Sequence, residues 1–154
     1  METYFKYLNS LPLPLWLAMM FAPGHSVTER LARSSTIFGL MALHYAISLV
    51  IAVGQVANGW RGQGGQAGTG KLALLSLGGI RTLLNSPSGA LAAWSHMLAL
   101  DLFTGGWIYR QCRRLNAPDY ARIGSLFFTF ATGPLGLLIF LLWRYFGAGR
   151  EETL

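Results

Sequence analysis

The feature that most constrains this chain is a single carboxylate inside a long apolar segment. Asp101 lies near the middle of the stretch between Gly89 and Arg110, which reads ALAAWSHMLALDLFTGGWIY. About 20 apolar residues are enough to cross a bilayer as a helix. A carboxylate at that depth costs roughly 2.5–3.5 kcal/mol on insertion scales, so Asp101 should face the protein interior and interact there. His96, five residues earlier, is the nearest titratable side chain in the sequence.

The composition also favours an integral membrane protein. Hydrophobic residues make up 53% of the chain and charged residues 12%, whereas a soluble domain carries about 25% charged residues. The net charge of +6 favours anionic lipid headgroups over nucleic acid, because no basic run is interleaved with aromatic residues in a polar context. Cys112 is the only cysteine, which excludes an internal disulfide.

Four apolar segments predict an all-α membrane bundle that forms a single domain over residues 1–154. The expected transmembrane spans are residues 4–22, 36–57, 88–109 and 123–146. Only Lys6 precedes the first apolar stretch and no small-residue cleavage site follows it, so we interpret this stretch as an uncleaved span. Pro12 and Pro14 should weaken or kink it, and Gly133-Pro134 should interrupt the fourth span. The dense basic cluster at 110–122 favours both termini outside.

A shorter apolar segment at about residues 72–85 should form a lateral helix. It is too short to span a membrane comfortably, so an interfacial or re-entrant position is expected. The following tetrapeptide Asn85-Ser86-Pro87-Ser88 should end this helix and cap the next one. The glycine-dense stretch 58–70 should be a loop. Within it, GQAGTGK at 65–71 matches part of a phosphate-binding loop, but Leu72 lacks the magnesium-binding hydroxyl and no strand precedes it, so we expect no nucleotide.

His96 and Asp101 are candidates for acid–base chemistry. Residues five apart are separated by about 140° around a helix, so the two side chains can flank one groove. An aromatic-lined groove with two titratable groups suits proton transfer on an apolar ligand. The alternative is that Asp101 only hydrogen-bonds to another helix. Arg81 could pair with Asp101 if the lateral helix is re-entrant, or could contact a headgroup. The expected apolar walls are Tyr45, Trp94, Phe103, Trp107 and Pro134.

His44 leaves a metal site open. If the second and third spans pack together, His44, His96 and Asp101 could form a site of two histidines and one carboxylate. The alternative is that His44 is satisfied by Ser48 or by a backbone carbonyl. The sequence does not show that the three side chains converge.

With these residues considered, the chain resembles the abscisic-acid-deficient-four-like membrane proteins, named for a plant chloroplast member needed to make neoxanthin from violaxanthin. The resemblance covers nearly the whole chain. It rests on GIRTLLNSP at 79–87, AWSHMLALDLF at 93–103, GGWI at 105–108 and GPLGLL at 133–138. Three positions depart from the family pattern: Met97 and Leu100 replace aromatic residues, and Gly106 replaces an arginine before Trp107. These departures lie beside Asp101, so another polyene is also a candidate substrate.

The resemblance implies a role in carotenoid metabolism. The plant reaction is an isomerisation that needs an acid at an epoxide oxygen and a base at carbon, and no redox cofactor. The resemblance then implies that Asp101 and His96 share the proton transfers and that Arg81 stabilises charge. Two alternatives stay open: a metal-dependent carotenoid oxygenase using His44, His96 and Asp101, and a non-catalytic carotenoid-binding or assembly protein. The expected partners are the lipid bilayer and a carotenoid or related isoprenoid. The expected location is a bacterial-type inner or photosynthetic membrane, because no transit peptide is recognised.

Overall fold

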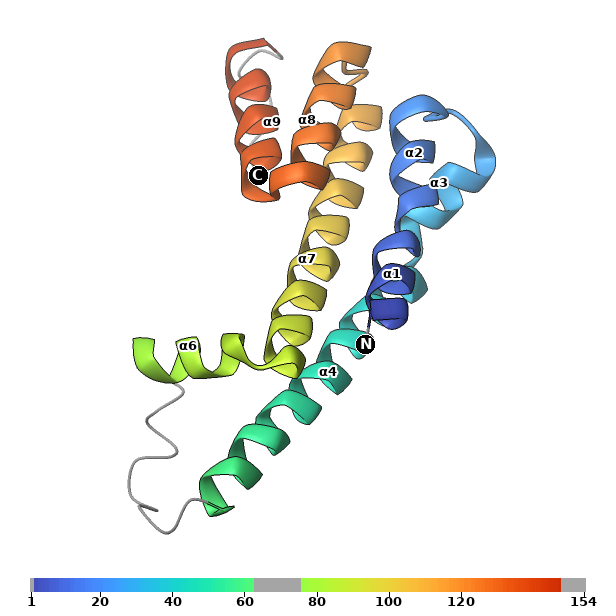
Figure 1. Ribbon diagram of the computed structural model, residues 1–154. Helices are drawn as coiled ribbons and strands as arrows, with labels where there is room; N and C mark the ends of the chain where they lie inside the picture. The colour runs from blue at the N-terminus through green and yellow to red at the C-terminus, as the bar shows by residue number, and fades with distance from the viewer. Residues whose placement is uncertain (1, 63–75, 148–154) are drawn as a thin grey trace. The chain divides into compact units, whose positions relative to one another are not determined.

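The computed structural model describes residues 2–62 and 76–147 (Figure 1). For residue 2 and residues 56–62 it describes the backbone alone. All regular elements in these ranges are α-helices, which confirms the predicted all-α class. The helices are α1 (Glu2–Ser10), α2 (Leu13–Phe21), α3 (Ser26–Arg33), α4 (Ser35–Gly62), α6 (Leu77–Asn85), α7 (Pro87–Arg114), α8 (Asp119–Thr132) and α9 (Pro134–Gly147).

The chain forms two compact units. The first contains Met1–Phe38 and Leu98–Leu154, and the second contains Gly39–Met97. The first unit therefore holds α1, α2, α3, α8, α9 and the second part of α7, together with the first turn of α4. The second unit holds the rest of α4, α6 and the first part of α7.

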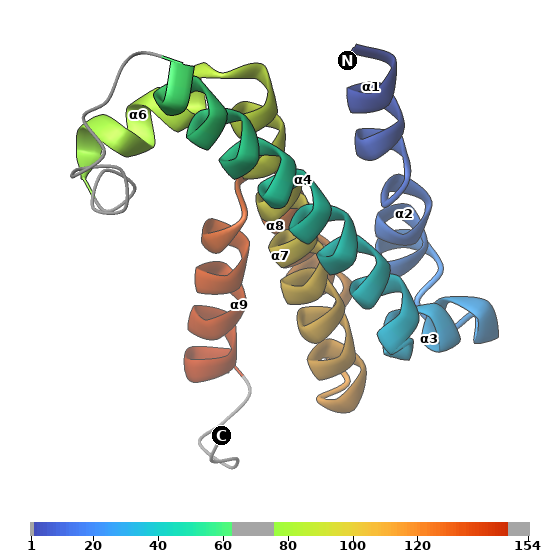
Figure 2. The same ribbon diagram turned by 90° about the horizontal axis from the view of Figure 1, so that it is seen from below.

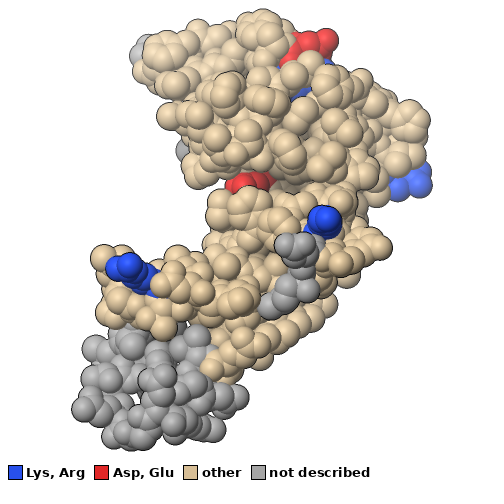
Figure 3. All heavy atoms as spheres, in the orientation of Figure 1, with Lys and Arg blue, Asp and Glu red and all other residues tan. Residues whose placement is uncertain are grey.

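One helix among the described residues is long and apolar enough to cross a membrane. It is the Ser35–Gln55 part of α4, which corresponds to the second expected span. Helix α7 is long enough, but polar residues such as Ser95, His96 and Asp101 interrupt its apolar sequence. Uncharged residues cover most of the surface seen in Figure 3, and lysines and arginines occur there as isolated spots. The described helices thus support membrane association through α4, and a bundle of four spans stays a prediction.

The first expected span is broken at its prolines, where the sequence predicts a weakened or kinked helix. Helix α1 ends at Ser10 and α2 begins at Leu13, with Pro12 at the cap and Pro14 in the first turn. Proline lacks the backbone N–H of a helix interior, and its ring clashes with the preceding turn, so the chain restarts as a new helix. Helix α2 then buries Leu15, Trp16 and two methionines.

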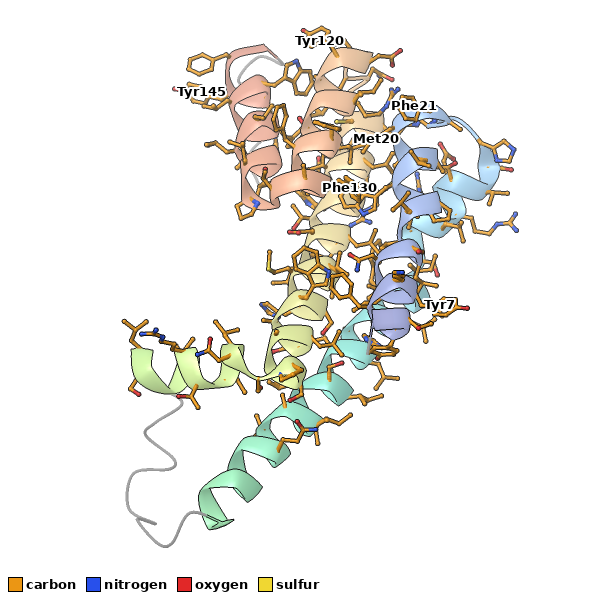
Figure 4. The ribbon with its side chains drawn as sticks, viewed as in Figure 1. Tyr7, Met20, Phe21, Tyr120, Phe130 and Tyr145 are labelled. Carbon is orange, nitrogen blue, oxygen red and sulfur yellow. The ribbon has the colours of Figure 1, made fainter. Side chains whose placement is uncertain are left out.

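The residues of the fourth expected span form a helical hairpin instead of one interrupted helix, and how they meet a membrane stays a prediction. Helices α8 and α9 are 14 residues each, or about 21 Å at the rise of an α-helix. They lie side by side, and the start of α8 and the end of α9 are at the same end of the pair, where Tyr120 and Tyr145 are labelled (Figures 1 and 4). The reversal occurs at Gly133, whose φ is 62°. The apolar run was long enough for a span, but a glycine in this conformation turns the chain back.

A close approach of the two backbones holds the hairpin together. A Cβ added at Gly136 would collide with the backbone nitrogen and hydroxyl of Thr129 and with the Ser125 carbonyl oxygen. Ser125 and Thr129 are fully buried, and the Thr129 hydroxyl donates to the Ser125 carbonyl at 2.7 Å. Glycine at 136 is therefore required by packing, not by backbone conformation.

The second part of α7 joins the helices of the first unit. Gly105 lies against the Trp16 ring of α2, with no room for a Cβ. The rings of Trp107 and Phe140 of α9 meet edge to face at 5.5 Å. The buried Tyr109 donates its hydroxyl hydrogen to the Pro23 carbonyl at 2.5 Å. These contacts pack the second part of α7 against α2 and α9.

A buried arginine ties α8 to α2. Arg122 is only 7% exposed. It donates to the Met20 carbonyl at 3.3 Å and pairs with Asp119 at 2.8 Å. The guanidinium thus satisfies a carbonyl near the end of α2, where helix carbonyls lack partners within the helix.

In the second unit, α6 is a helix over residues 77–85 of the segment predicted to form a lateral helix, and its interfacial or re-entrant position stays a prediction. It ends at Asn85, and Figures 1 and 2 show it running off to the side from the start of α7. The Ser86 hydroxyl accepts from the Gly89 N–H at 3.0 Å and so caps α7, as the sequence predicts. Ser88 donates to the Gln55 side chain of α4 at 2.6 Å. The phosphate-loop-like motif at 65–71 lies outside the described residues.

Candidate functional site

Asp101 lies beside the turn between α8 and α9. The residue is half-buried, and a Cβ added at Gly133 would lie 2.6 Å from its Oδ1 atom. Its carboxylate therefore reaches the backbone of a turn 32 residues later in the sequence. This turn is also where α9 begins, and the partial positive charge of a helix N-terminus favours an anion there. Asp101 is thus held at a junction of three helices of the first unit.

The aromatic residues near Asp101 on α7 engage other helices. Phe103 is 52% exposed, and its ring meets that of Phe38 edge to face at 5.8 Å. Trp107 is half-buried against Phe140. Pro134 is exposed and is the first residue of α9. Their role as walls of a ligand site stays a prediction, since Phe103 and Pro134 present open surface and Trp107 joins α7 to α9.

The other predicted site residues belong to the second unit. The imidazole of His96 lies against the Tyr45 ring, with centroids 4.7 Å apart and planes at 54°. Trp94 is 39% exposed, His44 is half-buried, and Arg81 is exposed on α6. The structure therefore brings His96 and Tyr45 together, while Asp101 is placed in the first unit.

No three His, Cys, Asp or Glu side chains in the described part of the chain come together in a group that could hold a metal ion. The alternative site of His44, His96 and Asp101 gains no support from these residues.

Comparison with known protein families shows to which family this chain belongs. The sequence pattern of the family described as ABA DEFICIENT 4-like matches residues 3–140. The chain belongs to this family. No curated protein and no solved structure matches it. The ABA DEFICIENT 4-like family is linked to carotenoid metabolism, which confirms the resemblance and the general role that it implies.

In this ABA DEFICIENT 4-like chain, sequence reasoning missed a basic hollow in the first unit. The hollow has a volume of about 720 Å³ and is lined by Glu29, Arg33, Arg110, Arg113 and Arg114. Arg113 pairs with Glu29 at 3.0 Å, and Arg110 donates to the Ala32 carbonyl at 2.6 Å. Burial and the nearby charge of Arg33 lower the pKa of Arg110. Arg33 and Arg110 are 77 residues apart, so no local pattern could have indicated that they meet.

Gly106 also has a structural explanation. A Cβ at this position would lie 2.6 Å from the Phe38 ring and 3.3 Å from the Arg110 guanidinium. The same guanidinium lies 5.8 Å from the centroid of the Phe38 ring, a distance at which a cation is attracted to the ring face. Phe38 and Arg110 thus fill the space that a side chain at 106 would need in this member of the ABA DEFICIENT 4-like family.

Proposed function

We propose that this protein is an isomerase of carotenoid metabolism that uses Asp101 for proton transfer and needs no redox cofactor. Family membership supports the substrate class, since the ABA DEFICIENT 4-like family is linked to this metabolism. The observation that carries the catalytic part is the position of Asp101. It is a half-buried carboxylate on a largely apolar stretch, held against the Gly133 turn at the start of α9.

The chemistry we assign is a balanced rearrangement. A C–H bond of the polyene breaks and its electrons form a new C=C bond, while the C–O bond of an epoxide opens and its oxygen gains a proton. No electrons are gained or lost, and the substrate and product have the same atoms. The step needs one group that accepts a proton and one that donates it.

Asp101 is assigned the role of base, because a carboxylate can accept the proton from carbon. We assign His96 the complementary role of acid and Arg81 the stabilisation of the developing charge on oxygen. The apolar walls proposed for the polyene are Tyr45, Trp94, Phe103, Trp107 and Pro134. An integral, multi-pass location in a bacterial-type inner or photosynthetic membrane is part of the proposal, because carotenoids dissolve in the bilayer.

Expression in cells that accumulate different carotenoids, followed by pigment chromatography, tests the proposal. The parent protein should convert one pigment to an isomer of the same mass. Asp101→Asn keeps the size of the side chain but removes the base, so conversion should be lost while the protein still inserts. His96→Ala should slow conversion at least tenfold, the usual scale for losing an acid–base group. Asp119→Asn makes the same chemical change at an exposed residue and should leave conversion unchanged.

Two other results would replace the proposal. Pigment that copurifies unchanged with both the parent and Asp101→Asn would identify a carotenoid-binding or assembly protein. Conversion that yields a product containing new oxygen, and that stops after metal removal, would identify an oxygenase. Equal conversion by the parent and both variants would place the chemistry at other residues.

A further inference from the structure

The basic hollow of the first unit is outside the proton-transfer site proposed above, and more positive than negative side chains line it. Among the residues that the structure describes, four arginines and one carboxylate, Glu29, line it. Glu29 is already paired with Arg113 at 3.0 Å. The side chains of this pair are 42% and 37% exposed, so water screens their interaction. The described lining residues of the hollow therefore carry a net positive charge, in a chain where only 12% of residues are charged.

Two of the arginines have structural roles that fix their positions. Arg110 donates to the Ala32 carbonyl near the end of α3, and its guanidinium lies over the Phe38 ring. Arg113 holds Glu29 of α3. These bonds anchor the last turns of α7 to α3, and so they hold a basic surface in place before any ligand arrives. A preorganised site loses less side-chain freedom on binding.

Arg33 has no such role. It forms no hydrogen bond or ion pair with any other residue that the structure describes. Its charge acts on Arg110, whose pKa is lowered by burial and by this like charge. Two guanidinium groups that repel each other across an open hollow are stabilised by an anion between them. Guanidinium groups match the oxygens of phosphate in geometry and can bind them in pairs.

The sequence position of Arg33 indicates where such an anion comes from. Arg33 lies two residues before Ser35, the start of the apolar stretch that is suited to cross a membrane. The end of a membrane-crossing helix lies at the level of the lipid headgroups, where basic residues meet anionic phosphates. We propose that the hollow is a binding site for an anionic phosphate group, with Arg33 and Arg114 joining the anchored Arg110 and Arg113 around it.

Thermal unfolding of the full-length protein in neutral detergent tests the site, because a ligand that binds the folded state raises the midpoint. The probes are dioctanoyl phosphatidic acid, inorganic phosphate and, as a lipid without net charge, dioctanoyl phosphatidylcholine, all at one ionic strength. Phosphatidic acid should raise the midpoint in a saturable way, and phosphatidylcholine should not. A saturable rise with inorganic phosphate as well would identify the phosphate group alone as sufficient, and no rise with it would identify the lipid as the ligand.

The variant Arg33→Gln should weaken phosphatidic acid binding about tenfold or more, the scale expected for one charge-assisted hydrogen bond. Arg33→Lys keeps the charge and should retain most of the phosphatidic acid binding. Arg30→Gln is the matched control, because Arg30 is an exposed arginine on the same helix that does not line the hollow. The unfolding midpoint without ligand checks that each variant folds. The proposal is wrong if no phosphate probe shifts the parent, or if Arg30→Gln weakens binding as much as Arg33→Gln.

Discussion

At the scale of single residues, position 133 imposes two requirements that only glycine meets. Its φ of 62° and ψ of −103° lie where residues with a Cβ are rarely found. A Cβ at this position would also lie 2.6 Å from the Asp101 carboxylate. The sequence indicated a break at Gly133-Pro134, but it gave no sign that Asp101 would lie against this glycine.

Gly133→Ala should therefore destabilise the protein by about 1–3 kcal/mol, the cost of a residue held in a disfavoured conformation, with crowding of Asp101 in addition. The measurement is the thermal unfolding midpoint in detergent. Gly124→Ala is the control, because Gly124 lies within α8 and a Cβ there meets nothing within 4 Å. That change should be neutral or stabilising by about 0.5–1 kcal/mol, since alanine favours helix. Equal midpoints for the two variants would contradict the assignment.

Cys112 should react slowly with thiol reagents in the folded protein. The residue is 2% exposed, and burial raises the pKa of its thiol to about 12, with Arg122 opposing the shift. Because the thiolate is the reactive form, labelling at pH 8 should be far slower than for a free cysteine and should increase as the pH rises towards 12. Mass spectrometry after iodoacetamide treatment measures this, with detergent-denatured protein as the reference. Fast labelling of the folded protein at pH 8 would contradict burial of this thiol.

At the scale of elements, the α8–α9 hairpin shows where sequence reasoning stopped. Residues 123–146 are apolar over a length that suits one membrane span, and proline after glycine is also found at kinks inside spans. Pro134 instead begins a new helix, where its missing N–H has no cost. Whether such a pair kinks or reverses the chain depends on what α8 and α9 can pack against, which is a tertiary property.

Gly136 tests the hairpin as a unit. Gly136→Ala places a methyl group against the Thr129 backbone and the Ser125 carbonyl oxygen. Backbone atoms do not move aside easily, so the change should destabilise the protein by about 1–3 kcal/mol, as overpacking does. The thermal unfolding midpoint measures it. Gly39→Ala on α4, where a Cβ meets nothing within 4 Å, should not lower the midpoint. A Gly136→Ala protein as stable as the parent would show that the two helices are not in close contact.

At the scale of the whole molecule, the features predicted from sequence are those with local causes. The helical class, the lateral helix and the Ser86 cap follow from apolar periodicity and from capping residues within a few positions. The basic hollow has no such local cause, since Arg33 joins it from a different helix than Arg110 and Arg114. The same holds for Asp101 and the Gly133 turn. Charge and composition indicated an affinity for anionic lipids, but the grouping of these side chains depends on packing.

A hairpin at residues 119–147 and a membrane crossing at the same place would put the end of the chain on different sides of the membrane. Each of its helices is about 21 Å long, and a bilayer core is about 30 Å thick, so we expect the pair to enter and leave by the same face. Protease-sensitive tags, one inserted at Asn116 and one after the last residue, should then be cut from the same side of sealed vesicles. Cleavage from opposite sides would mean that residues 119–147 do cross. Four crossings would place both termini on one side. If the first three expected spans cross and the hairpin does not, the number of crossings is odd. The two ends of the polypeptide would then face different compartments. The reversal of the chain at a single glycine would decide this, because it makes the number of crossings odd instead of even.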